Sequence, residues 1–251
     1  MHIAGPTRVS LLDADPDLGR ELDAERADAA RRLTTPVLQL RRGPFCPDDD
    51  VPDASGAFAL LVLDGLLVRE ALVGDHPSAE LIGPGDLVRV ALEADMDSLL
   101  PRTVEWSVIT PARVALLSPA LISAAAPWPE LLAALMDRAA RRADRLMVLQ
   151  AITHFTRVDD RLHALLWYLA ERWGRVVPEG VALNLRLPHR TLAGMVGARR
   201  PSVTTAFGQL MARGVVERRD DGAWVLRGGP PERRLRPAEE PIAAELRSLP
   251  A

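Results

Sequence analysis

The spacing of apolar residues changes near residue 128 and divides the chain into two kinds of predicted structure. Between residues 36 and 117, short runs rich in Val and Leu alternate with turn-forming residues, as in "AFALLVLDGLLVREALV" followed by "GDHPSAE". Such runs predict many short strands. After Trp128 the apolar residues follow a helical period, which predicts helices. We therefore predict an α+β chain whose amino-terminal part is an antiparallel sandwich or β-roll.

Two amphipathic helices are predicted outside the strand-rich part. Near the amino terminus, "DLGRELDAERADAARRL" predicts one helix from the near-helical spacing of Leu18, Leu22, Ala29 and Leu33. The stretch "PELLAALMDRAARRADRLMVLQAITHF" predicts a helix of roughly 25 residues. Its apolar stripe is formed by Leu132, Leu135, Met136, Ala139, Ala143, Leu146 and Leu149, with Arg138, Arg141, Arg142 and Arg145 largely off it. An Ala-rich stripe between two other units favours a helix contact in a dimer over packing in the core of its own domain.

The carboxyl-terminal third predicts a winged helix-turn-helix. "VDDRLHALLWYLAERWG" predicts a helix that ends at Gly174, "RVVPEG" a turn, and "VALNLRL" a short strand. In "TLAGMVGARRPSVTTAFGQLMARGVV", two short apolar-striped segments flank Gly197, which suits a sharp turn, and Pro201 suits the first turn of the second helix. The following "VVERRDDGAWVLR" predicts a hairpin with its turn at Asp221 and Gly222.

The charges in this region indicate which helix contacts DNA. Arg199 and Arg200 lie at the start of the second helix, where free N–H groups and the helix dipole also favour a phosphate or a base acceptor. Small or flexible polar residues follow along that helix, namely Ser202, Thr204, Thr205 and Gln209. Further arginines precede the first helix or lie on the hairpin: Arg190, Arg218, Arg219 and Arg227. We favour DNA binding over arginines that merely solvate the surface, and over a winged helix that binds protein.

Length, charge and cysteine content exclude several classes of protein. At 251 residues and 27.3 kDa, with 48% hydrophobic residues, the chain is long enough for two domains. The net charge of −3 conceals a basic segment after Val181. The single cysteine, Cys46, excludes an internal disulfide and an iron–sulfur cluster held by this chain alone. We find no signal layout, no long apolar run and no catalytic motif, and expect a cytoplasmic protein that is neither an enzyme nor a membrane protein.

The stretch "LPHRTLAGMVGARRPSVTTAFGQLMARGVVERR" resembles the helix-turn-helix signature of the cyclic-AMP receptor and fumarate–nitrate regulator (Crp/Fnr) superfamily, and a weaker likeness extends over most of the chain. Gly65 in "VLDGLLVRE" and the "IGPGDL" segment at residues 82–87 look like β-roll turns of that family. The resemblance implies a cyclic-nucleotide-binding-like β-roll over residues 1–127, a dimerisation helix and hinge over 128–157, a winged helix-turn-helix over 158–230 and a tail over 231–251.

The resemblance also implies roles for individual residues. Arg200 falls on the family's base-reading arginine, with guanine O6 and N7 as its targets. Pro201 and Thr205 replace an acidic and an arginine base-reader of the best-known member, so we expect a different operator. Arg199 stands where Ser or Thr commonly caps the helix, and a phosphate is expected to take the role of the cap.

The implied effector site is degenerate. Arg89 and Val90 stand where cyclic-AMP-binding members have a Gly-Glu pair, Arg102 and Thr103 are candidates for the phosphate pair, and Glu93 could substitute for the lost acceptor. We therefore favour a site that does not bind cyclic AMP, with another effector or none left open, and we expect no cofactor. Haem ligated through His2 or His76 is the remaining alternative. Double-stranded DNA, a second copy of the chain, RNA polymerase and a small-molecule or nucleotide effector are the candidate partners.

Overall fold

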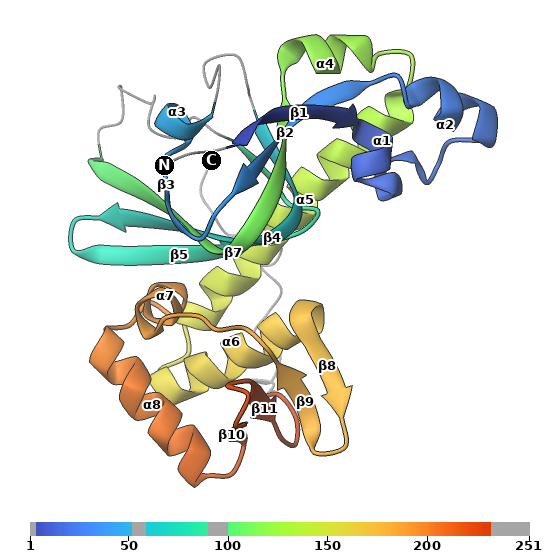
Figure 1. Cartoon of the computed structure of the whole chain (residues 1–251). Helices are drawn as coiled ribbons and strands as arrows, with labels where there is room; N and C mark the ends of the chain where they lie inside the picture. Colours follow the sequence, from blue (N-terminus) through green and yellow to red (C-terminus); the bar gives the residue numbers. More distant parts are fainter. Residues whose placement is uncertain (1–3, 52–58, 90–99, 232–251) are drawn as a thin grey trace, which may run out of the picture.

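The structure is a computed structural model, and it describes residues 4–51, 59–89 and 100–231 (Figure 1). An antiparallel sheet forms the amino-terminal part, one long helix follows, and a smaller helical domain with its own sheet forms the carboxyl-terminal part. The predicted α+β class with an amino-terminal antiparallel roll is confirmed.

The amino-terminal sheet has seven strands in the main order β1-β2-β7-β4-β5, with β3 paired to β7 and β6 paired to β4. All of its pairings are antiparallel. The strands are β1 (Ala4–Ser10), β2 (Thr34–Leu40), β3 (Gly43–Phe45), β4 (Ala59–Val73), β5 (His76–Ile82), β6 (Leu87–Arg89) and β7 (Arg102–Leu117). The inner face buries Leu38, Leu60, Ile82, Trp106 and Val114 in one core.

Strands β4 and β7 are much longer than the predicted short strands, at 15 and 16 residues. We expected a turn at Gly65, but β4 continues through it. Gly65 has a φ of 82°, and the register with β7 shifts between Val62 and Leu67. A Cβ atom at Gly65 would lie 2.3 Å from the carbonyl oxygen of Pro111. The glycine therefore bends a continuous strand where two backbones approach closely.

The prediction of one amino-terminal helix is wrong. The segment forms β1, then α1 (Leu11–Ala14), the 3-10 helix η1 (Pro16–Gly19) and α2 (Ala24–Ala30). The Asp23 carboxylate accepts a hydrogen bond from the Arg26 backbone N–H at 2.8 Å and starts a new helix at that point. Leu18 and Leu33 are both buried in one core, but Leu18 lies in η1 and Leu33 lies in the connection between α2 and β2. Their helical spacing was therefore a coincidence of two local structures.

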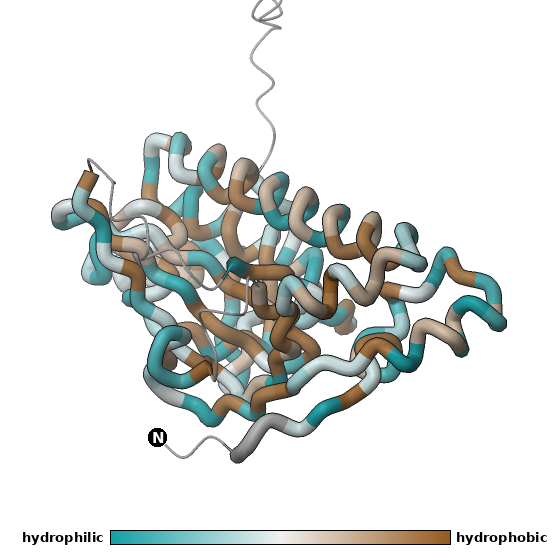
Figure 2. The backbone as a smooth tube through the Cα atoms, turned by 90° about the horizontal axis from the view of Figure 1, so that it is seen from above, coloured by the Kyte–Doolittle hydropathy of each residue, from teal (hydrophilic) through white to brown (hydrophobic). Residues whose placement is uncertain are grey.

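Helix α5 (Pro129–Thr153) confirms the predicted long helix, but its apolar residues divide between two directions. Leu131, Leu135, Leu149 and Ile152 are buried within the chain, whereas the side chain of Met136 is 74% exposed. Met147 is also largely exposed. The predicted stripe is therefore only partly available to a second molecule. Figure 2 shows helix turns that alternate between hydrophobic and hydrophilic positions, as expected when each helix has one apolar face.

The carboxyl-terminal domain contains α6 (Val158–Trp173), α7 (His189–Met195) and α8 (Arg200–Ala212). Its sheet has the order β10-β11-β9-β8, with β8 (Gly174–Val177), β9 (Gly180–Leu183), β10 (Val216–Arg218) and β11 (Trp224–Leu226). The prediction that "RVVPEG" is only a turn is wrong, because Arg175 to Val177 pair with β9 as a hairpin. Their β-branched valines favour a strand, and only Pro178 and Glu179 turn.

Two further short helices, α3 (Pro47–Asp50) and α4 (Pro119–Ala124), complete the secondary structure of the described residues. Across those same residues, every helix is too short or too polar to cross a membrane.

Candidate nucleic-acid interface

The turn between α7 and α8 is held by backbone geometry and by one arginine. Gly197 has a φ of 60°, as the predicted sharp turn requires. Arg161 of α6 donates hydrogen bonds to the carbonyl oxygens of Val196 (3.2 Å) and Gly197 (3.1 Å). These bonds satisfy acceptors at the end of α7 and fix α7 and α8 against α6.

Helix α8 begins without a side-chain cap. Arg199 occupies the N-cap position in an extended conformation, makes no capping hydrogen bond, and is followed by Arg200 and Pro201 in the first turn. The start of a helix has unsatisfied N–H groups and the positive end of the helix dipole. Both features favour an anion beside Arg199.

The two faces of α8 differ in burial. Val203, Ala206, Phe207 and Leu210 are buried in the domain core. The predicted DNA-contacting residues of this helix are all exposed: Arg199, Arg200, Ser202, Thr204, Thr205 and Gln209. The structure therefore places these six predicted residues together on one open surface.

Two of the small hydroxyl groups on α8 already have partners. Thr205 donates to the carbonyl oxygen of Pro201 (3.2 Å), and Thr204 donates to that of Arg200 (3.3 Å). The Oγ1 atom of Thr204 also lies 3.0 Å from Nδ1 of His189. Such back-bonding keeps each side chain close to the helix surface, which leaves room beside it for a base edge.

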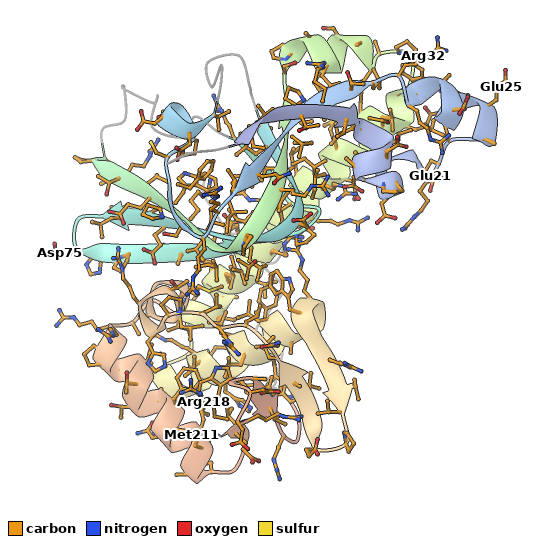
Figure 3. All side chains as sticks on the ribbon, in the orientation of Figure 1. Glu21, Glu25, Arg32, Asp75, Met211 and Arg218 are labelled. Atoms are coloured by element: carbon orange, nitrogen blue, oxygen red, sulfur yellow. The ribbon has the colours of Figure 1, made fainter. Side chains whose placement is uncertain are left out.

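Most arginines around α8 form no ion pair with a carboxylate of the described residues, or only a long one. In the part of the chain that the structure describes, neither Arg199 nor Arg200 forms an ion pair. Arg218 stacks over Trp224, with 5.5 Å between its guanidinium carbon and the ring centroid, on the side of the molecule away from the β-roll (Figure 3). Arg219 is weakly paired with Asp221, at 3.7 Å, whereas Arg227 is paired with Glu217 at 2.5 Å. Arg227 is therefore the least available of the predicted hairpin cations.

His189 was not predicted as part of this surface. Its ring stacks on Phe207 with 5.1 Å between centroids, and Phe207 stacks on Trp224 at 4.3 Å. Burial lowers the pKa of His189, and the nearby charges of Arg200 and Arg218 lower it further. A lone histidine at the start of a helix gives no signal of this contact in the sequence. The stack connects the hairpin, α8 and the start of α7.

Arg190 lies apart from the other predicted DNA contacts. Its guanidinium is 3.1 Å from a carboxylate oxygen of Glu70 and 3.2 Å from one of Glu105, both in the β-roll. The neighbouring Thr191 is only 4% exposed and donates to Glu70 at 3.5 Å. The structure therefore directs this end of α7 toward the sheet.

Helix α7 is covered on both sides, by the core of its own domain and by β5 (Figure 1). The backbones approach so closely that a Cβ atom on Gly194 would lie 2.9 Å from the Cβ atom of Ala79. The helix-turn-helix is thus docked on the β-roll through its first helix while its second helix stays open.

Two of the three predicted effector residues lie in the described part of the chain. Arg102 and Thr103 are exposed at the start of β7, opposite Val73 and Leu72 of β4. Glu93 lies outside the described residues. Their predicted role in ligand binding therefore stays a prediction.

Comparisons with known proteins agree with this architecture. Residues 160–227 match the Crp-like helix-turn-helix domain family. The regulatory protein CysR of Synechococcus elongatus is 30% identical over 172 residues, which cover 66% of this chain and 75% of CysR.

Solved structures share the fold at low sequence identity. A mutant of CooA from Carboxydothermus hydrogenoformans has a TM-score of 0.60 at 15% identity, over 76% of this chain and 83% of that chain. The c-di-GMP responsive global regulator CLP of Xanthomonas campestris has a TM-score of 0.57 at 20% identity, over 77% of this chain and 94% of that chain.

CysR, the relative matched by sequence, is a regulatory protein, and the helix-turn-helix lies where the family match places it. Together with the shared fold, these findings confirm the resemblance that the sequence indicated. The chain belongs to the Crp/Fnr family of transcriptional regulators and carries that family's helix-turn-helix DNA-binding domain.

Proposed function

We propose that the protein is a homodimer that binds a near-palindromic DNA operator with one α8 helix in each of two successive major grooves. The observation that carries this proposal is the open face of α8, where arginines without ion pairs surround an uncapped helix start. A two-fold dimer of this kind has its half-sites about 34 to 36 Å apart.

The residues of this surface divide into base contacts and phosphate contacts. Arg200 donates to guanine O6 and N7, and Ser202, Thr204, Thr205 and Gln209 approach neighbouring base edges or phosphates. Arg199 holds a phosphate at the start of α8, and Arg218 and Arg219 hold phosphates from the hairpin. Arg190 reaches a phosphate only after it leaves Glu70 and Glu105, so its contribution depends on how the domain is docked.

The dimer contact is proposed to lie on the exposed side of α5. Met136 and Met147 are apolar, largely exposed and three turns apart on this helix, and Ala143 between them is also exposed. The opposite side of α5 is occupied by contacts with the β-roll. In the proposed division of the chain, residues 1–127 form the sensor and residues 128–157 form the dimerisation helix and hinge. Residues 158–230 form the DNA-binding domain, and residues 231–251 form a tail.

The β-roll is proposed not to bind cyclic AMP. Arg89 is exposed at the end of β6, where cyclic-AMP-binding relatives carry the glycine of the Gly-Glu pair. Val90 stands in place of the glutamate of that pair, and its side chain offers no acceptor for a ribose hydroxyl. The proposal also includes RNA polymerase as a partner, as expected of a regulator of transcription.

Selection of bound fragments from random DNA tests the operator proposal, with the full chain and with or without a panel of cyclic nucleotides. We expect an enriched near-palindrome that does not depend on the nucleotide. No enriched palindrome under any condition would favour the alternative, a winged helix that binds protein. Enrichment only with a nucleotide would contradict our proposal for the β-roll.

The Arg218→Ala variant tests the division of labour between the residues. It should weaken binding to every sequence alike and flatten the dependence of affinity on salt, because Arg218 is assigned to phosphate. The Arg200→Ala variant should instead relax the preference at one base in each half-site. Equal loss on every sequence for both variants contradicts these assignments.

A further inference from the structure

His189 is held between α8 and the β10–β11 hairpin, the two parts of the domain that are proposed to contact DNA. Its ring lies nearly parallel to that of Phe207, with an interplanar angle of 18° and 5.1 Å between the centroids. Phe207 stacks in turn on Trp224 of the hairpin. At the edge of the histidine ring, Nδ1 lies 3.0 Å from the Oγ1 atom of Thr204. The stack and this contact fix the ring beside the open face of α8.

The second ring nitrogen of His189, Nε2, is available to a partner. It has no hydrogen-bond partner among the described residues. In that part of the chain, the one side-chain polar atom that is both buried and unpartnered is Nδ1 of His163, so Nε2 of His189 is open to solvent. The ring therefore has one nitrogen fixed on Thr204 and one nitrogen free for a molecule that lies on α8.

The charged groups that act on the ring are both cations. They are Arg200 of α8 and Arg218 of β10, and both are exposed. Within the described residues, no carboxylate acts on the ring to balance them. Burial lowers the pKa of His189, and the charges of these two arginines lower it further. In the free protein the ring is therefore neutral at pH 7.

DNA reverses the electrostatic environment of the ring. In the proposed complex Arg200 contacts a guanine and Arg218 contacts a phosphate, so DNA covers the surface on which His189 lies. The duplex carries one negative charge per roughly 1.7 Å of its axis, and these charges offset the two guanidiniums. An anion within about 4 to 6 Å of an ionisable group favours its charged form by about one to three pKa units. The complex therefore favours a protonated ring.

We propose that His189 is a further contact of the operator, and that its ring takes up one proton from the solvent when DNA binds. In the protonated ring both nitrogens donate, Nδ1 to Oγ1 of Thr204 and Nε2 to a phosphate oxygen. Because Oγ1 then accepts from His189, the hydroxyl hydrogen of Thr204 stays on the carbonyl oxygen of Arg200 or turns to an acceptor of the DNA. The inference rests on the proposed function, which it deepens by one contact and one proton.

Proton uptake makes the affinity for the operator depend on pH. A group whose pKa is higher in the complex than in the free protein strengthens binding as the pH falls. The affinity should rise as the pH falls through the pKa of the bound ring, and it should level off below the pKa of the free ring. Each unit by which the two pKa values differ changes the affinity about tenfold per protomer.

Titration of the histidine resonances by NMR tests the proposal on the full chain with carbon-13-labelled histidine. The chain is measured free and bound to a duplex of about 30 base pairs that carries the selected operator. If selection yields no operator, a random-sequence duplex of the same length replaces it. We expect the pKa of His189 to rise by at least about one unit in the complex. The pKa of His76, which is exposed at the start of β5 in the β-roll, should rise by less than about 0.3 unit.

Matched variants connect the proton to affinity at constant salt. The operator affinity of the wild-type dimer should rise about tenfold or more between about pH 8 and about pH 6. His189→Gln stays neutral, keeps a hydrogen-bonding group for Thr204 and identifies the His189 resonance, and its affinity should change less than about twofold over this range. His76→Gln should keep the wild-type dependence. If His189→Gln does not fold, His189→Arg serves in its place, because its planar cation also stacks on aromatic rings and does not titrate.

The outcomes separate this inference from the proposed function. A complex in which the pKa of His189 does not rise overturns the inference and leaves operator binding standing. An equal rise at His76 also overturns it, since the field of the DNA would then act on every histidine alike. Failure of either duplex to bind overturns the inference and the proposed function together.

Discussion

The arginines of α5 and those at the start of α8 differ in ion pairing and in exposure to solvent. On α5, Arg138, Arg142 and Arg145 are paired with Asp15, Glu80 and Asp86 of the β-roll, and all are partly buried. On α8, Arg199 and Arg200 are exposed and have no ion pair to another described residue. The first set holds two parts of the chain together, and the second is available to a partner.

The difference shows that a count of arginines does not identify a nucleic-acid surface. What distinguishes the two sets is whether the fold supplies a carboxylate within reach. Removing a partner from the first set should cost stability, because it leaves a partly buried charge without its counterion. Removing an arginine from the second should cost DNA affinity and leave stability nearly unchanged.

The largest expected effect is on stability, at Asp86. This residue is only 2% exposed, accepts a 2.8 Å hydrogen bond from the Gly83 N–H, and binds two guanidiniums. We expect Asp86→Ala to lower the free energy of unfolding by about 3 kcal/mol, measured by urea titration. Asp137→Ala is the control, since its pair with Arg141 is exposed, and it should cost less than about 0.5 kcal/mol. Equal losses would show that burial does not govern these pairs.

The next prediction compares one arginine of α8 with one arginine of α5, and it separates an effect on DNA affinity from an effect on stability. Arg200→Ala should weaken binding to the selected operator by about 1 to 3 kcal/mol while the midpoint of urea unfolding stays the same. Arg142→Ala, which leaves Glu80 with Arg69 alone, should lower the midpoint. Operator titrations and unfolding curves on both variants check the prediction. A loss of stability in Arg200→Ala would mean that this arginine has a structural partner.

Substitutions at two helical glycines should have smaller effects on stability, and the two effects should have opposite signs. Gly208 of α8 has open space where a Cβ atom would lie, so Gly208→Ala should stabilise the protein by about 0.5 to 1 kcal/mol. At Gly194 of α7 the added methyl group meets Ala79 at 2.9 Å. Gly194→Ala should therefore destabilise the docked arrangement by about 1 kcal/mol despite the same gain in helix propensity.

Thermal unfolding of the two glycine variants measures the difference, and limited proteolysis between α5 and α6 reports undocking of the domain. Faster cleavage in Gly194→Ala but not in Gly208→Ala supports the docked contact. Stabilisation of both variants would show that α7 does not rest on β5 in solution.

The smallest effect concerns pH. The pKa of His189 is lowered in the folded protein by burial and by Arg200 and Arg218, so the unfolded chain takes up the proton first as pH falls. Stability is therefore complete above the ordinary histidine pKa of about 6.5 and is lost as pH falls through the lower folded value. His163, also with a lowered pKa, acts in the same direction. Urea unfolding between about pH 7 and 5 should show a shallower dependence in His189→Gln.

Local signals in the sequence were sufficient to predict the helix-turn-helix. Gly197, Pro201 and the apolar faces of α7 and α8 each act over a few residues, and the structure confirms each of them. The contact of Arg190 with Glu105 joins residues 85 positions apart, and no periodicity reports such a contact. The prediction of a single amino-terminal helix failed for the opposite reason, because the apolar spacing that suggested it runs across η1, α2 and the residues that connect them.

The continuous pairing of β4 with β7 has a consequence for the order of folding. Ala59 pairs with Leu117, and the ladder extends to Val73 and Arg102, so its formation requires closure of long loops. The hairpin of β8 and β9 closes over a few residues. Because non-local pairing slows folding, we expect the carboxyl-terminal domain to acquire protected amides first when the denatured chain is returned to native conditions. Pulse-labelled hydrogen exchange would reveal the opposite order if the long ladder were the nucleus.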